Sequence, residues 1–241
     1  MSNLDNKNNY NIYIYWENRK NKKTPNIVNK CYNIMKKKHN NIIFLNEKNI
    51  KEYIDIIDIS HLQHIAHKAD YFRAKILYKF GGIWLDIDTI LLDNLDKDWD
   101  NFYNSDKLVA LDVGCIAYMM SKKNNIIFEK WIKQIENIIK LKKHIKWGDI
   151  GGTLLKNIII ENNYQKYIYN FPKIVFRMGY LDYLKFYDTN HFTVKNNINK
   201  IKNNNIKIII LYGTYMYDKK YHTSSLINQI FNLSHKNTYN T

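Results

Sequence analysis

Hydrophobic and polar positions along this chain follow each other as strands followed by helices do. Asn11 to Trp16 is a β-rich run, and Asn26 to Lys38 carries apolar residues at helical spacing just after Pro25, which suits a first helical turn. Asn41 to Leu45 predicts a second buried strand, and a short helix is expected near Asn49 to Ile56. This order predicts a parallel sheet with helices packed on it.

A longer helix is expected from His61 to Lys79, with Ser60 as its N-cap. Gly81 is expected to end this helix with a positive φ, and Ile83 to Ile87 reads as the next strand. Residues Tyr164 to Asn205 show no clear pattern. The other expected elements are strands Leu108–Val113 and Cys115–Met120, a helix over Asn124–Lys140, a Gly-rich loop opening a helix over Trp147–Asn163, a late strand Ile206–Gly213 and a terminal helix Ser224–Phe231.

Composition favours a folded protein with an ample core. The chain has 241 residues, of which 45% are hydrophobic and 15% aromatic, despite many Asn and Lys residues. Its 37 basic and 22 acidic residues give a formal net charge of +15, which raises the local concentration of anions. The lysines are spread along the chain, so solvated faces are favoured over a nucleic-acid stripe. Membrane surfaces and phosphorylated substrates stay open as partners.

Two features bear on the compartment. Cys31 and Cys115 lie in apolar surroundings without CxxC spacing, which favours buried free thiols over a disulfide or a metal site. The first residues contain no long apolar signal segment, and no stretch reaches the roughly 18 apolar residues of a membrane span. We therefore expect a soluble, cytoplasmic protein (in the host cytoplasm if the source is a virus), with peripheral membrane contact left open.

Two carboxylates follow the third expected strand. Asp86 and Asp88 flank Ile87, so strand alternation would place both carboxylates on one face, about 7 Å apart at their Cα atoms. Two such carboxylates can share one hard cation, and ligands of open α/β sheets bind at the carboxyl ends of strands. An Asp-x-Asp by itself is weak evidence, because solvated strand ends supply many.

The preceding helix adds a second pair of charged residues. Asp70 and Arg73 are three positions apart and face the same way, on or beside the buried stripe. They form either an intrahelical ion pair at the edge of the core or a site in which a guanidinium grips a phosphate or sugar and a carboxylate a sugar hydroxyl. Gly81 and Gly82 would reverse the chain tightly, so that this pair and the Asp86 strand end converge.

Three further candidates have weaker signals. Asp149 in the Gly-rich loop is equally consistent with an acceptor contact and with a cap of its own helix. His61, His64 and His67 drift around the helix, and no carboxylate completes a zinc set. The 20 tyrosines could stack bases, but they are abundant throughout.

The stretch "ADYFRAKILYKFGGIWLDIDTILLDNLD" resembles the signature of DxD-containing glycosyltransferases with a GT-A fold. This family comprises yeast-type α-mannosyltransferases and capsular polysaccharide enzymes, with the glucosylating domains of clostridial toxins as relatives. Its pattern is Asp-x-x-Arg on a helix, then Tyr-x-x-Gly-Gly-[Ile/Met]-[Tyr/Trp]-Leu-Asp-x-Asp. Every element is present, including the sixteen-residue step from Asp70 to Asp86.

The resemblance implies an α/β fold: a GT-A-like, Rossmann-type nucleotide-sugar-binding domain with a mainly parallel central sheet flanked by helices. It implies one domain over residues 1–241, with a donor-binding core at about 10–120 and an acceptor-side part at about 121–235. The activity implied is metal-dependent transfer, with retention, of a hexose from a UDP- or GDP-sugar to a glycan, protein or small acceptor.

The resemblance also implies roles for particular residues. Asp88 would be the direct Mn²⁺ or Mg²⁺ ligand, and Asp86 would touch the ribose and the metal. Asp70 would hold donor-sugar hydroxyls, and Arg73 the sugar or the phosphate. Trp16 follows the first strand, where the family often stacks an aromatic residue on the base, with Tyr15 as the next candidate; a Trp that closes the edge of the core is the alternative.

One departure from the pattern concerns the late strand. The family often carries His before Leu-Tyr or Leu-Trp, and Ile210 holds that place here, so a late ligand is missing or comes from another residue such as His222. Two alternatives therefore stay open. One is an inactive or weakly active relative that binds sugar nucleotides. The other is a basic nucleic-acid-binding protein whose aspartates hold a metal for phosphodiester chemistry.

Overall fold

The computed structural model describes residues 10–18, 22–112, 115–141, 144–171, 173–178, 180–211 and 220–236. The chain forms two compact units, each assembled from separate segments. The first unit contains residues 1–17, 41–86 and 96–171, and the second contains residues 18–40, 87–95 and 172–241. The chain therefore passes from the first unit into the second within the Asp-Ile-Asp motif, directly after Asp86.

The first unit is built on a six-stranded sheet with the strand order β2-β1-β3-β6-β5-β7. β1 runs parallel to β2 and β3, β6 runs antiparallel to β3 and β5, and β5 runs parallel to β7. Most neighbouring pairs are thus parallel, as expected. The strands are β1 (Ile12–Tyr15), β2 (Ile42–Leu45), β3 (Gly82–Leu85), β5 (Val109–Asp112), β6 (Cys115–Ser121) and β7 (Ile168–Tyr169).

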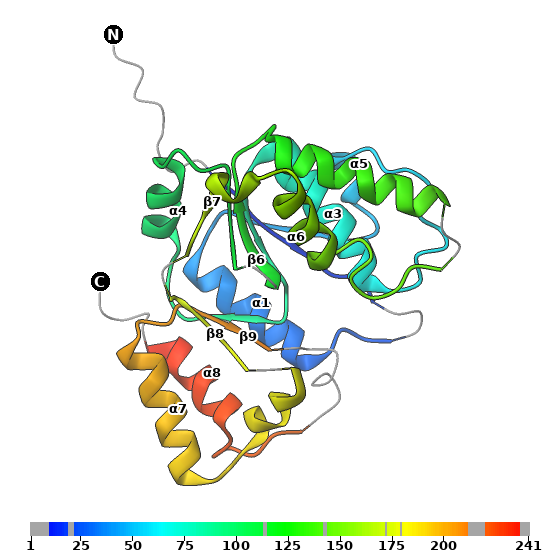
Figure 1. Cartoon of the computed structure of the whole chain (residues 1–241). Coiled ribbons are helices and arrows are strands. Elements are labelled where there is room, and N and C mark those ends of the chain that lie inside the picture. The colour runs from blue at the N-terminus through cyan, green and yellow to red at the C-terminus, as the bar shows by residue number, and fades with distance from the viewer. Residues whose placement is uncertain are drawn as a thin grey trace. The chain divides into compact units, whose positions relative to one another are not determined.

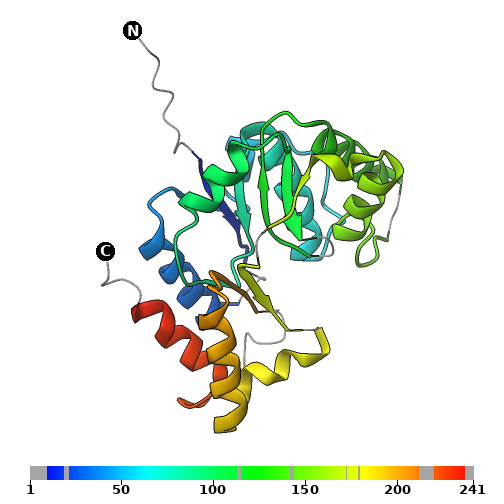
Figure 2. The same ribbon diagram turned by 60° about the vertical axis from the view of Figure 1, so that its left-hand side comes forward.

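Helices cover both faces of this sheet. Figure 1 shows α3, α5 and α6 together on one side and α4 on the other, and the turned view in Figure 2 agrees. Apolar residues recur at helical spacing along α3 and α5, which is why these helices pack on the sheet and on each other. The helices of the first unit are α2 (Ile50–Tyr53), α3 (Ile65–Phe80), α4 (Asp96–Tyr103), α5 (Ile126–Leu141), α6 (Gly152–Glu161) and the 3₁₀ helix η1 (Tyr164–Tyr167).

The core of the first unit lies between the sheet and the α3–α5–α6 layer. Tyr71, Trp84, Phe128 and Trp131 are among its fully buried side chains. Burial of each large apolar side chain stabilises the fold by roughly 1.5–3 kcal/mol. The indole Nε1 of Trp131 also donates a hydrogen bond of 3.0 Å to the carbonyl oxygen of Ile150, which fixes the segment that leads into α6.

The second unit has a three-stranded sheet with the order β4-β9-β8, in which β9 is antiparallel to β4 and parallel to β8. Helix α1 packs against β4, and α7 and α8 lie side by side, as Figures 1 and 2 show. The elements of this unit are α1 (Asn26–Lys38), β4 (Thr89–Leu91), β8 (Val175–Arg177), η2 (Tyr180–Tyr187), α7 (His191–Asn203), β9 (Ile208–Ile210) and α8 (Leu226–Lys236).

The sequence predicted the helix before the motif with one error. Gly81 ends α3 with a φ of 68°, which confirms its expected role. The helix begins at Ile65, however, and not at His61. Ser60 lies in a turn in which its backbone N–H donates to Oδ1 of Asp58 at 2.9 Å, so Ser60 does not cap the helix.

The strand that carries the Asp-Ile-Asp motif is also shorter than expected. β3 ends at Leu85, and Ile87 and Asp88 lie in a turn before β4. Strand alternation therefore stops before the motif and does not decide the relative directions of the two carboxylates. The cause is tertiary, because β4 pairs with β9 in the sheet of the second unit.

Several elements were not predicted, among them β4, α4, β7, β8 and α7. Helix α7 has a recognisable start, because the side chain of Asn190 accepts hydrogen bonds from the backbone N–H groups of Phe192 and Thr193. The late strand is observed as β9, whereas Tyr212 and Gly213 of the expected strand lie outside the described residues. Among the residues that the structure describes, no helix is long and apolar enough to cross a membrane. A single functional domain over 1–241 remains a prediction.

Candidate active site

The reversal between α3 and β3 depends on two glycines with positive φ, Gly81 at 68° and Gly82 at 95°. A Cβ on Gly81 would lie 2.9 Å from the carbonyl oxygen of Ser121, and a Cβ on Gly82 would lie 2.5 Å from that of Asn11. Both approaches are to backbone atoms, which cannot swing aside as the end of a side chain can. The glycines therefore allow α3 to pack directly beside the strands and to bring Asp70 and Arg73 to the end of β3.

Arg73 is the centre of the resulting cluster. Its Nη2 lies 3.2 Å from Oδ1 of Asp70 and 3.1 Å from Oδ1 of Asp86. Its Nη1 donates to the backbone carbonyl of Ile116 on β6, and the guanidinium lies 5.2 Å from the ring centroid of Trp84. Arg73 is only 3% exposed. A buried guanidinium with two carboxylate partners, a carbonyl and an aromatic face has a fixed position and orientation.

Asp86 is held by three contacts. Its Oδ1 faces Arg73 and accepts a 2.9 Å hydrogen bond from the indole Nε1 of Trp84, and its backbone N–H donates to Ala117 at 2.8 Å. Within the described part of the chain, Oδ2 of Asp86 accepts no hydrogen bond. The Asp86 side chain is 31% exposed. One oxygen of this carboxylate therefore orients the group, and the other is free to bind a ligand.

Asp70 lies deeper than Asp86, and its side chain is 14% exposed. Burial raises the pKa of Asp70 to about 7, against the opposing effect of Arg73, and the charge of Asp86 raises it further. The carboxylate also lies against backbone, because a Cβ on Gly151 would be 2.5 Å from Oδ2 of Asp70. Gly151, directly before α6, thus leaves the space that Asp70 occupies, a role that the sequence analysis did not assign to it.

Asp88 belongs to the second unit. Its backbone carbonyl accepts a hydrogen bond of 3.3 Å from the N–H of Leu211, next to β9. Burial raises the pKa of the Cys31 thiol on α1, and the negative charge of Asp88 contributes to the same shift. Asp88 is half-buried. Because Asp86 and Asp88 are two residues apart, covalent geometry limits the distance between their Cα atoms to about 7.6 Å.

The donor atoms of this motif suit a hard divalent cation. Carboxylate oxygens are the ligands that Mg²⁺ and Mn²⁺ prefer, and Oδ2 of Asp86 is available. Among the described residues, no three His, Cys, Asp or Glu side chains are placed to hold a metal by themselves. A cation bound at Oδ2 of Asp86 would therefore complete its coordination with substrate oxygens and water, as is common for Mg²⁺ with phosphates.

The two aromatic candidates after β1 are both buried. Tyr15 is 4% exposed, donates a 2.6 Å hydrogen bond to Glu17 and packs edge-on against Phe72, with ring centroids 5.0 Å apart. Trp16 is 8% exposed. Both positions agree with the alternative of aromatics that close the edge of the core. A stacking role on a base remains a prediction for Trp16 and Tyr15.

The weaker candidates have local structural roles. Oδ2 of Asp149 accepts a 3.1 Å hydrogen bond from the N–H of Lys146 within the loop before α6. Nδ1 of His222 lies 2.8 Å from Oγ of Ser224, in the turn before α8. Ile210 is 4% exposed in β9, a buried strand position that suits its apolar side chain. Cys31 is fully buried and Cys115 is partly buried, and neither forms a disulfide bond within the described part of the chain.

Comparison with solved structures supports the fold. The apo-form glycosyltransferase GlyE of Streptococcus pneumoniae TIGR4 is similar over 93% of this chain and 60% of that chain, with a TM-score of 0.51 and 14% sequence identity. The likeness concerns the fold alone. The mixed α/β fold with its mainly parallel sheet is that of the GT-A glycosyltransferases.

Sequence comparison finds a partial match to a protein family. Residues 2–107 match the family described as "Glycosyltransferase sugar-binding region containing DXD motif". This segment includes Asp70, Arg73, Asp86 and Asp88, the four residues of the motif. In this segment, which is less than half of the chain, the sequence is similar to that family.

Two curated proteins show partial similarity. The O-glycosyltransferase PaGT of Phomopsis amygdali is 29% identical over 90 residues, which are 35% of this chain and 21% of that protein. The ATP synthase subunit delta of Wigglesworthia glossinidia brevipalpis is 32% identical over 110 residues, 43% of this chain and 59% of that protein. The chain thus spans less than two thirds of either relative. An Asn-, Lys- and Ile-rich composition by itself raises identity between unrelated chains, so the second match carries no functional argument.

Proposed function

We propose that this protein is a metal-dependent hexosyltransferase that uses a nucleoside diphosphate sugar, UDP- or GDP-linked, as donor. The acceptor is a hydroxyl group of a glycan, a protein or a small molecule. The observation that carries the proposal is the buried Arg73 guanidinium fixed between Asp70 and Asp86 at the carboxyl end of β3. The match of residues 2–107 to the DXD-containing glycosyltransferase family supports the reaction class.

The position of the cluster suits a sugar nucleotide. Ligands of open α/β sheets bind beyond the carboxyl ends of the strands, where β3 delivers Asp86. In the proposed complex, Asp70 accepts hydrogen bonds from sugar hydroxyls, and Arg73 orients Asp70 and Asp86 while its positive charge favours the diphosphate. The formal net charge of +15 raises the local concentration of such anionic donors.

Asp86 and Asp88 would hold Mn²⁺ or Mg²⁺. A divalent cation bound there offsets the negative charge that develops on the departing diphosphate. In the transfer, the bond between the anomeric carbon and the diphosphate oxygen breaks, and a bond from the acceptor hydroxyl oxygen to the anomeric carbon forms. The hydroxyl proton passes to the released nucleoside diphosphate.

We propose retention of the anomeric configuration. The sequence offers no confident nucleophile for a covalent intermediate, and the proton transfer to the diphosphate keeps the acceptor and the leaving group on the same face of the sugar. The carboxylates that lie together, Asp70 and Asp86, are engaged by Arg73 and so are assigned to binding and orientation. A cytoplasmic site of action remains a prediction from the sequence.

A panel assay tests this function. The protein is incubated with UDP- and GDP-sugars and Mn²⁺, and free nucleoside diphosphate is measured. Release of the diphosphate with one donor is expected, with loss of at least 100-fold in the Asp88→Ala variant and after removal of the metal by a chelator. Asp93→Ala is the matched control, since it removes an exposed aspartate of the same segment.

A second candidate function is that of a relative that binds sugar nucleotides without turnover. The observation that favours it is Ile210, which stands where the family often has a His. Its signature is Mn²⁺-dependent thermal stabilisation by UDP or GDP with no release of diphosphate from any sugar nucleotide. Tight, salt-sensitive DNA binding that Asp88→Ala does not change would contradict both readings in favour of a nucleic-acid-binding protein.

A further inference from the structure

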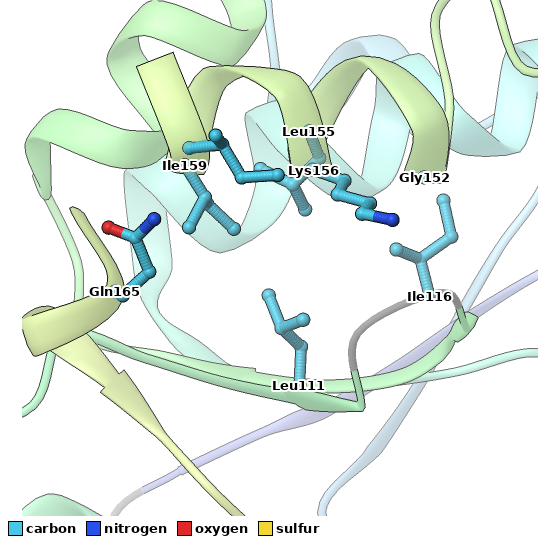
Figure 3. Close-up of a pocket in the computed structure, with 8 residues that line it drawn as sticks. Leu111, Ile116, Gly152, Leu155, Lys156, Ile159 and Gln165 are labelled. Atoms are coloured by element: carbon cyan, nitrogen blue, oxygen red, sulfur yellow. The ribbon is translucent and has the colours of Figure 1, made fainter. Parts of the chain in front are cut away.

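An apolar pocket lies in the first unit, between the β5 and β6 strands and α6. The space inside it, counted together with its open mouth, is about 410 Å³. Figure 3 shows Leu111 and Ile116 on the strand side facing Leu155 and Ile159 on α6. Ile160, Gly152, Lys156 and Gln165 complete its lining.

The chain leaves this space unfilled at the end next to Gly152. An added Cβ on Gly152 would meet the side chain of Ile116 at 3.5 Å, which is ordinary van der Waals contact. A small apolar side chain would therefore fit there and close the gap between α6 and β6. Glycine at the first position of α6 instead leaves that space unfilled.

The end of the pocket next to Gly152 adjoins the carboxylate cluster. Ile116, which lines the pocket, supplies the carbonyl that accepts from Nη1 of Arg73. Gly151, the neighbour of the lining residue Gly152, lies against the Asp70 carboxylate. A molecule seated in the pocket would thus have one end beside the residues that are proposed to hold the donor sugar.

We propose that this pocket binds the apolar body of the acceptor, which is a small alcohol with an aromatic or aliphatic skeleton. The proposal rests on the proposed function and names its substrate class. The lining favours an apolar body, because Leu111, Ile116 and Ile159 offer no hydrogen-bond partner and only Lys156 and Gln165 bring polar groups to the pocket. The acceptor hydroxyl would point out of the apolar pocket, at the Gly152 end, toward Asp70.

Binding is tested first without donor or metal, so that it does not depend on turnover. The probe is 2-naphthol, an aromatic alcohol whose fluorescence reports transfer into an apolar site, titrated with the full chain. Saturable 1:1 binding is expected, with no comparable binding of glycerol. Leu111→Phe and Gly152→Ala fill the pocket from opposite sides, and each should weaken binding at least 5-fold.

Leu184→Phe is the matched control, because Leu184 is 53% exposed on η2 and does not line the pocket. It should leave the affinity for 2-naphthol unchanged. Gly152→Ala should also keep or raise the melting temperature, because alanine is favoured over glycine in helices. Weak binding of this variant then reports a filled pocket and not an unfolded chain.

The acceptor role is tested by adding the donor identified in the panel assay and Mn²⁺, and by detecting glycosylated 2-naphthol by mass spectrometry. Formation of this product, reduced in Leu111→Phe, supports the assignment. Absence of saturable 2-naphthol binding while donor turnover is normal overturns the pocket proposal alone. Binding without product in a preparation that turns over the donor overturns the acceptor role. Binding by a chain that turns over no donor supports the pocket and contradicts the proposed function.

Discussion

Nη2 of Arg73 on α3 lies 3.1 Å from Oδ1 of Asp86, the first residue after β3, and this ion pair joins the helix to the motif that follows it. The guanidinium is buried, whereas the carboxylate is partly open to solvent. A buried cation with a partly exposed partner orients that partner at little cost to ligand access. The contact explains how a strand end can hold a carboxylate in place for a ligand.

Loss of the Arg73 guanidinium should destabilise the first unit. Arg73→Met leaves Asp70 and Asp86 without their cationic partner. We expect the free energy of unfolding, measured in urea, to fall by about 3 kcal/mol. Lys75→Met on the same helix is the control, because the Lys75–Glu136 pair is more exposed and should be worth less than about 1 kcal/mol. A loss for Arg73→Met no larger than that for Lys75→Met would contradict the assigned role.

Asp70 should make stability depend on pH. Its folded pKa is raised to about 7 mainly by burial, so the stability it contributes is present below about pH 4 and is lost as the pH rises through 7. Asp70→Asn removes this titration. The free energy of unfolding of the variant, relative to the unchanged protein, should rise between pH 4 and pH 7 by up to about 1.4 kcal/mol per pH unit. Urea unfolding of both proteins at several pH values measures this difference. A difference that does not change with pH would refute the assignment.

Gly151 should matter for activity more than for folding. A Cβ there would lie 2.5 Å from Oδ2 of Asp70, so Gly151→Ala must displace the carboxylate. We expect kcat/KM for the donor found in the panel assay to fall roughly 10- to 100-fold, which corresponds to about 1.4–2.8 kcal/mol of lost transition-state binding. Thermal unfolding monitors the fold in parallel. Unchanged kcat/KM in a folded Gly151→Ala variant would show that activity does not depend on the Asp70 carboxylate occupying the space beside Gly151.

His67 should sensitise the protein to acid. It is 3% exposed, and its Nε2 has no hydrogen-bond partner among the described residues. Burial, followed by the charge of His64, lowers the pKa of His67, whereas Asp149 opposes the shift. The stability that the neutral His67 imidazole contributes is therefore fully present above about pH 6.5. It is lost as the pH falls from there through the lowered pKa of His67 in the folded protein.

His67→Leu tests this dependence. The variant should gain stability relative to the unchanged protein between pH 8 and pH 5, by up to about 1.4 kcal/mol per pH unit, as measured by urea unfolding. His61→Leu is the control, because His61 is exposed in the turn before α3 and should show no such gain. An equal pH dependence in both variants would rule out the buried imidazole as the cause.

Much of the local structure could be predicted from the sequence. The spacing of apolar residues gave the bounds of α1, and Gly81 marked the end of α3 through its tolerance of positive φ. The spacing of Asp70 and Arg73 on one helix placed them side by side, and the structure confirms that they pair. These features depend on interactions within a few residues, which a sequence pattern records directly.

Contacts between distant segments could not be predicted in this way. Gly151 follows Asp70 by 81 positions, and no local pattern links the two. β4 has too few residues to signal a strand, and its pairing with β9 decides where β3 must end. The burial of Tyr15 and Trp16 likewise depends on the elements packed over β1.

The sequence by itself thus determined which residues form the motif: a helix with Asp70 and Arg73, a glycine reversal and the Asp-Ile-Asp that follows. Only the tertiary structure decided how each is used. It joined Arg73 to both carboxylates, placed the Trp84 indole on Asp86, opened space for Asp70 beside Gly151 and left the apolar pocket next to them. The physical reason is that helix ends and turns are fixed by local backbone preferences, whereas burial and contact are fixed by how separate elements pack.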